Sequence, residues 1–191
     1  GSDGQLGVAM PYLLAGLPCA AARIQQQFPQ QIGRATDRWT IASLVLALGD
    51  VTQGSSDCAA TFVELLDSAD PLVQFVAARA VCLGSGELDC PRIVRHLAAP
   101  LSRTDNDTTT PNGWPWDDLT SLFASMLRTI DRTRGQQLIC AALPELVNLG
   151  KYTSSHLAEA ALPLLFERGH VPELEALSET CYRMVPVAGA C

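Results

Sequence analysis

Between residues 72 and 83 the apolar side chains recur with the spacing of a helix that has one buried face. They lie at positions i, i+3, i+4 and i+7, which is the stripe of an amphipathic helix. Asp70 and Pro71 come immediately before this segment, as a side chain that can cap free amides and a residue suited to the first helical position. Gly84 follows it and can close the helix. The sequence therefore predicts a capped helix over 72–83.

A second helical pattern, residues 58–66, lies just upstream. The connection between the two helices is too short for anything but an antiparallel hairpin, and such a hairpin needs neighbours to cover its remaining apolar surface. Residues 37–49 supply one neighbour, because they align with residues 72–84 at a shift of 35 positions that places Gly49 on Gly84. Self-similarity with a period of about 35 indicates a helical solenoid.

Similar patterns continue less regularly along the rest of the chain. Further helices are predicted over residues 3–15, 18–32, 89–99, 117–130, 134–149, 154–168 and 172–184. The helix over 89–99 begins with Asp89, which can cap it. We expect Pro29 to interrupt the chain after the second of these helices, and Pro144 and Pro163 to kink the helices that contain them. The predicted fold is all-α, a right-handed α-solenoid of antiparallel helix pairs. We expect it to form a single domain over residues 1–191, and we interpret Gly1 and Ser2 as residues left by cloning.

One segment resembles a known repeat family. Asp70-Pro71-Leu72-Val73, followed by Ala77-Ala78-Arg79-Ala80 and Leu83-Gly84, looks like the second helix of a HEAT-type repeat. In that repeat an Asp-Pro turn precedes an Ala-rich helix that ends in Leu-Gly. The likeness is strongest over 57–84 and weaker over 35–56 and 87–99. It implies a HEAT-like array that binds a protein partner along its concave face.

Residues 100–115 depart from this family pattern, because they form a long polar insertion where a short turn is expected. Loops longer than about 12 residues are usually functional or disordered. Trp114 and Trp116 lie at the end of this segment. The preferred interpretation is that they pack the loop onto the helices, and the second is that they anchor a partner. The acidic residues within it are interpreted as a solvated turn rather than a cation site. The candidate partner-binding residues are Asp105, Asp107, Trp114, Trp116, Asp117 and Asp118.

The charge of the chain bears on the type of partner. The formal net charge is −7 and the sequence pI is about 4.8, so a phosphate backbone is an unfavourable ligand and nucleic acid is not expected. No apolar run reaches the roughly 20 residues that a membrane span needs. The three histidines, His96, His156 and His170, form no site by their spacing, although His96 lies beside two arginines on a face expected to be exposed. No catalytic residue, cofactor or metal site is predicted.

The function expected from these observations is a protein-interaction scaffold or adaptor that binds a protein on its concave face. Two alternatives stay open. One is a HEAT-like enzyme of the lyase or base-excision type, which the Trp and Asp residues of 114–118 suggest by residue type but the negative charge opposes. The other is a regulatory helical fragment of a larger protein. Arg128, Arg132 and Arg134 form a small positive patch, interpreted as a solvated helix end with local salt bridges rather than a docking site for an acidic partner.

The chain has seven cysteines, and no CxxC pair. Cys82 and Cys140 lie in apolar runs and are expected to pack in the core. Cys58 and Cys90 lie near predicted helix starts, where a thiol can be activated, but an inert, partly buried thiol is the favoured interpretation. Cys181 and Cys191, near the end of the chain, could form a disulfide. A reducing compartment is favoured, so the expected location is the cytoplasm.

Overall fold

The computed structural model describes residues 11, 15–101, 119–147, 160, 161, 163 and 164. Within these residues the chain is helical and contains no strand, which confirms the all-α prediction for the described part. The predicted helices over 3–15 and 172–184 lie outside the described residues, apart from Pro11 and Ala15, and only four residues of 154–168 are described. The elements are η1 (Pro18–Ala20), α2 (Ala21–Ile32), α3 (Arg38–Val51), α4 (Ala59–Leu65), α5 (Pro71–Leu83), α6 (Cys90–Leu101), α7 (Leu119–Thr129) and α8 (Arg132–Val147).

Four helices begin with the same device, an aspartate that accepts a hydrogen bond from an amide of the first turn. This bond satisfies a donor that has no partner inside the helix. The caps predicted at Asp70 and Asp89 are confirmed. The four bonds run from Thr40 N to Asp37 at 2.7 Å, from Leu72 N to Asp70 at 2.8 Å, from Arg92 N to Asp89 at 3.3 Å, and from Arg134 N to Asp131 at 3.2 Å.

The spacing of two of these caps differs from the predicted shift of 35 positions. Asp37 and Asp70 start α3 and α5 and lie 33 positions apart, not 35. Gly49 therefore does not correspond to Gly84. Gly84 is the C-terminal cap of α5, whereas Gly49 lies inside α3, which continues to Val51. The sequence alignment shifted the register because it matched the two glycines and not the two caps.

Helix α2 ends at Ile32, as the predicted helix over 18–32 does, and Pro29 lies inside it. The buried face of α2 consists of Ile24, Phe28 and Ile32, at the spacing of successive helical turns. Phe28 and Ile32 flank the proline on this face, so their burial holds the helix together across the hydrogen bond that Pro29 cannot make.

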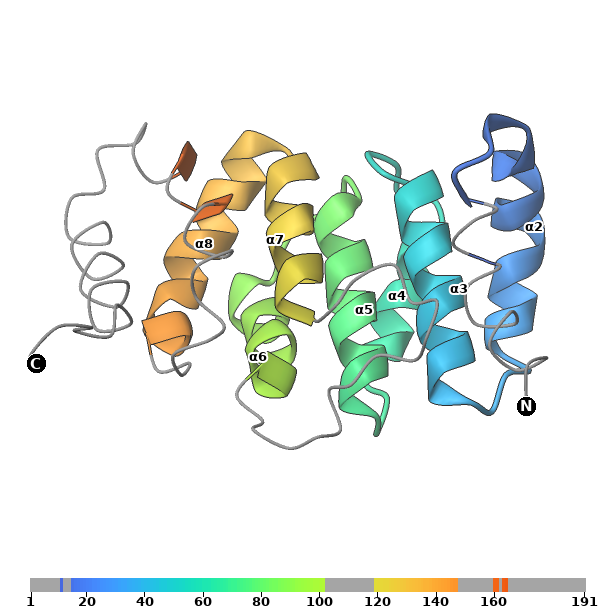
Figure 1. Cartoon of the computed structure of the whole chain (residues 1–191), viewed down its shortest axis with the longest axis horizontal. Helices are drawn as coiled ribbons and strands as arrows, with labels where there is room; N and C mark the ends of the chain where they lie inside the picture. Colours follow the sequence, from blue (N-terminus) through green and yellow to red (C-terminus); the bar gives the residue numbers. More distant parts are fainter. Residues whose placement is uncertain (1–10, 12–14, 102–118, 148–159, 162, 165–191) are drawn as a thin grey trace, which may run out of the picture.

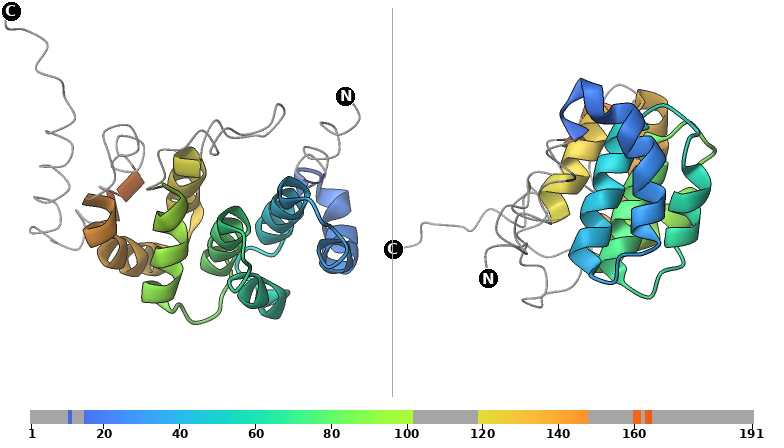
Figure 2. Two further views of the ribbon diagram at one scale, coloured as in Figure 1. Left: turned by 90° about the horizontal axis from the view of Figure 1, so that it is seen from below. Right: turned by 90° about the vertical axis from the view of Figure 1, so that its right-hand side faces the viewer.

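Helix α5 lies at the centre of the described fold. It contacts α3, α4, α6 and α7, with its most extensive contact on α3. Figure 1 shows α3, α5 and α7 side by side and running in the same direction, with α4 behind α5, and Figure 2 gives the same order from below. Because α5 has neighbours on several sides, its burial is not limited to one stripe: ten of its residues are buried. In α3 every residue from Ala42 to Gly49 is buried.

The close contact between α3 and α5 depends on small residues. A Cβ atom added to Gly49 would lie 3.0 Å from Cβ and 3.3 Å from Cα of Ala80. Real Cβ atoms are rarely this close to other atoms, so the glycine lets the two helix axes approach at this point. Two small residues, Gly49 and Ala80, therefore meet where α3 and α5 approach each other closely.

Among the described residues, no helix is both long enough and apolar enough to cross a membrane.

Candidate functional site

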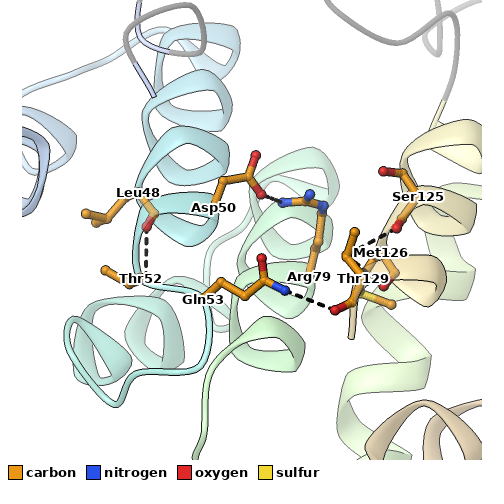
Figure 3. A network of polar contacts seen from close by, with 8 residues as sticks. All are labelled: Leu48, Asp50, Thr52, Gln53, Arg79, Ser125, Met126 and Thr129. Atoms are coloured by element: carbon orange, nitrogen blue, oxygen red, sulfur yellow. Dashed lines mark hydrogen bonds and ion pairs between the residues drawn. The ribbon is translucent and has the colours of Figure 1, made fainter. Parts of the chain in front are cut away.

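The six residues predicted to bind a partner all lie outside the described residues. They are Asp105, Asp107, Trp114, Trp116, Asp117 and Asp118. The structure does place the start of the predicted insertion, because α6 extends to Leu101 and Pro100 belongs to this helix. The candidate site that can be described is a set of polar contacts between helices, shown in Figure 3.

The central contact of this set joins α3 to α5. Nη1 of Arg79 lies 2.8 Å from Oδ1 of Asp50, and Arg79 is only 3% exposed while the Asp50 side chain is 28% exposed. A guanidinium loses much of its hydration when it is buried, and a neighbouring carboxylate offsets that cost. Arg79 lies within the apolar pattern that predicted this helix, so the pattern alone gives no sign of a charge pair. The pair fixes how α3 and α5 sit against each other.

A second contact joins the turn after α3 to the end of α7. Nε2 of Gln53 donates to the carbonyl oxygen of Thr129 at 3.0 Å (Figure 3). The last carbonyls of a helix have no partner within it, so a side chain from another element satisfies one of them here. The hydroxyl of Thr52 makes a local bond of the same kind and donates to the carbonyl of Leu48 at 2.8 Å.

The turns that follow α3 and α5 are also joined directly. The amide of Gly54 donates to the carbonyl of Leu83 at 2.9 Å, and the amide of Ser85 donates to the carbonyl of Ser55 at 3.2 Å. Gly54 has φ of +75°, a conformation that glycine adopts without strain. The C-terminal ends of α3, α5 and α7 therefore form one connected edge, which we call the C-terminal edge.

Arg134, in the first turn of α8, completes this edge from the other direction. Its Nη2 donates to the carbonyl of Val81 at 3.2 Å, its Nε donates to the carbonyl of Cys82 at 3.3 Å, and its Nη1 donates to the carbonyl of Gly86. A cation is favourable at the negative end of a helix. Arg134 thus binds the end of α5 through carbonyl groups, so this member of the predicted patch of three arginines is partly buried and engaged by backbone carbonyls.

We expect Arg134→Ala to lower the free energy of unfolding by about 1.5 kcal/mol, because it leaves partly buried carbonyls without their donor. Urea denaturation measures this change. Arg95→Ala, at an exposed arginine of α6, is the matched control and should change stability by less than about 0.5 kcal/mol. Equal stability losses in the two variants would remove the capping role of Arg134.

The cysteines near helix starts are not activated. Burial raises the pKa of the Cys58 thiol, and the nearby Asp57 raises it further. Burial also raises the pKa of the Cys90 thiol, and Asp89 adds to this, although Arg134 acts in the opposite direction. A thiol with a raised pKa contains less of the reactive thiolate. The structure therefore agrees with the interpretation of Cys58 and Cys90 as inert thiols.

Cys82 is fully buried on α5, as predicted, whereas Cys140 is only partly buried against the core. Burial raises the pKa of Cys82 from 9.0 to about 12. The thiol is therefore neutral in the folded protein, whereas the unfolded chain loses this proton above about pH 9. The contribution of Cys82 to stability is accordingly constant below about pH 9 and falls as the pH rises towards 12.

We expect iodoacetamide at pH 8 to label the exposed Cys19 rapidly and Cys82 only as fast as the whole protein unfolds. Mass spectrometry of the digested protein reports each cysteine separately. Labelling of Cys82 at the rate of Cys19, without unfolding, would contradict its burial.

His96 is partly buried, although its face was expected to be exposed. Burial lowers its pKa, and Arg92 and Arg95 lower it further, so the imidazole is neutral at neutral pH. Arg92 also pairs with Asp67 at 2.7 Å, which joins α6 to the turn before α5. In the described part of the chain, no three or more His, Cys, Asp or Glu side chains are grouped so that they could hold a metal ion.

Comparisons of the chain with models of protein families, with curated proteins and with solved structures gave no match.

Proposed function

We propose that the chain is a protein-interaction scaffold, built as a HEAT-like right-handed solenoid of antiparallel helix pairs. The observation that carries this proposal is the order of the helix contacts. Every extensive contact joins elements that are next to each other in the chain or separated by one element. Stacked repeat proteins pack in this way, because each unit covers the apolar surface of the next.

The polar contacts support the same proposal. The ion pair of Asp50 with Arg79 joins α3 to α5, two helices that a stack would place beside each other. A stacked array derives its use from the long surface that it presents, and this surface commonly binds another protein.

The distribution of exposed residues indicates where a partner can bind. The middle turns of α3, from Ala42 to Gly49, carry no exposed side chain, and α5 is similarly buried. A partner that binds the predicted concave face would therefore contact its margins, which include the C-terminal edge with exposed residues such as Gln53 and Glu87. Loops on a rigid scaffold are common binding sites, and we keep the 100–116 segment as the second part of the proposed surface.

Affinity purification of the tagged chain, followed by quantitative mass spectrometry, tests this function. We expect to capture one protein partner, and we expect added untagged chain to compete for it. Trp114→Ala and Trp116→Ala should capture less of this partner at an unchanged melting temperature. Leu17→Ala, at an exposed apolar residue of the described part, is the control and should bind as the parent does. The absence of any competed partner would contradict the scaffold function. Normal capture by both tryptophan variants would remove only the role of the 100–116 segment.

A further inference from the structure

The end of the described helix row at α2 carries positive charge on a protein that is otherwise acidic. The chain has 20 acidic and 13 basic residues, yet residues 15–36 contain two arginines and no carboxylate. The next acidic residue, Asp37, is already engaged, because it accepts hydrogen bonds from the Thr40 amide at 2.7 Å and from the Thr40 hydroxyl at 2.9 Å. This end is therefore a local exception to the net charge of −7.

The positive charges lie on one line along the helix. Arg23, Gln27, Gln30 and Arg34 occupy positions i, i+4, i+7 and i+11, which fall on a single face, and all four are exposed. Arg34 lies two residues beyond Ile32, the last residue of α2, and its amide still donates to the carbonyl of Gln31, so the turn continues to it. We call these four residues the α2 stripe.

The α2 stripe faces away from the rest of the described fold. The buried residues of α2 lie on another side of the helix, roughly 130° around from the stripe, and the extensive contacts of α2 are with η1 and α3. In the right-hand view of Figure 2, α2 is the described helix nearest the viewer, at the end of the row. The side chains of the stripe are held partly in place, because Nε of Arg23 donates to Oε1 of Gln27 at 3.2 Å.

The positive charge of this face is not needed by a helix that ends a stack. A helix that ends a stack needs a polar outer face for solubility, and neutral or acidic side chains would serve as well. The α2 stripe instead combines guanidinium groups, which bind carboxylates with two hydrogen bonds, with amides that can donate to and accept from a peptide backbone. We propose that the α2 stripe docks an acidic peptide segment of the partner protein; this assignment rests on the proposed scaffold function.

The spacing of the arginines defines the segment. Arg34 lies eleven positions after Arg23, which along the helix and the turn that follows it is a rise of about 16 Å. About five residues of extended chain span this distance, so the segment needs two carboxylates about five residues apart. A long polyanion fits less well, because its further charges would meet the acidic remainder of the protein, whereas a short segment contacts only the stripe.

A fluorescein-labelled decapeptide of Gly and Ser with two Glu residues five positions apart tests this proposal by fluorescence anisotropy with the full chain. We expect saturable binding that weakens with added salt, and a loss of at least about fivefold in affinity for Arg23→Glu. Arg95→Glu changes the net charge equally at an exposed position on α6 and should keep the affinity within about twofold. No saturable binding by the parent, or an equal loss in both variants, would overturn the proposal.

Two further probes separate other ligand classes. Oligothymidylate of the same length and vesicles that contain phosphatidylserine are measured with the same variants. Weaker binding of both probes than of the peptide supports the proposal, and tighter binding of either through Arg23 overturns it.

The variant Arg23→Glu/Arg34→Glu distinguishes failure of this surface from failure of the scaffold function. Loss of the purified partner by this variant supports the α2 stripe as its docking site. Capture of the partner by the parent and the variant alike overturns the stripe and leaves the scaffold function standing. If the parent captures no competed partner, the scaffold function fails.

Discussion

Asp50→Asn should lower the free energy of unfolding by about 3 kcal/mol, because it removes the carboxylate that pairs with the buried Arg79 guanidinium. The expected loss is near the lower end of the range for breaking a buried ion pair, since the Asp50 side chain is 28% exposed. Urea denaturation, analysed at constant m-value, measures it.

Two further variants isolate the effect of the charge pair. Asp57→Asn removes an exposed carboxylate from the turn after α3 and should change stability by less than about 0.5 kcal/mol. Asp50→Asn/Arg79→Met removes both charges and should recover most of the loss, because no unpaired ion remains buried. If Asp50→Asn costs no more than Asp57→Asn, the ion pair does not stabilise the contact between α3 and α5.

Gly49→Val should lower the free energy of unfolding by about 3 kcal/mol, and Gly49→Ala by somewhat less. The reason is steric: the added Cβ would lie 3.0 Å from Cβ and 3.3 Å from Cα of Ala80, so the two helices have to move apart. Better helix propensity returns at most about 1 kcal/mol. Thermal and urea denaturation measure the difference.

Gly33 offers the matched control for this prediction. A Cβ atom there would lie 3.8 Å from the nearest carbonyl oxygens, which is ordinary contact, so Gly33→Val should be close to neutral. Gly49→Ala should also cost less when it is combined with Ala80→Gly, because the nearest atom is then gone. Independent effects of the two substitutions would contradict the close approach of α3 and α5.

Local features of the chain could be predicted well from the sequence. The helix over 72–83 and the caps at Asp70 and Asp89 depend on residues within one or two turns of each other, and the structure confirms them. Pro29 does not end α2, because Phe28 and Ile32 are buried on both sides of it, and a local rule for proline does not include such tertiary burial.

Features that join separate helices could not be predicted in this way. The pairing of Asp50 with Arg79, and the binding of Arg134 to the end of α5, depend on the rotation and rise of each helix relative to its neighbours. Arg134 was interpreted as part of a surface patch, because its partners are backbone carbonyls some 50 residues earlier and its own segment gives no sign of them.

The order in which the helices stack is the basis of both proposed binding surfaces, and nuclear Overhauser spectroscopy on methyl-labelled protein tests it most directly. We predict abundant cross-peaks between methyl groups of α3 and α5, further ones from α5 to α6, and none between α2 and α8, which lie at opposite ends of the described row (Figure 1). Cross-peaks that join α2 to α8, or the absence of any between α3 and α5, would contradict the stacked arrangement.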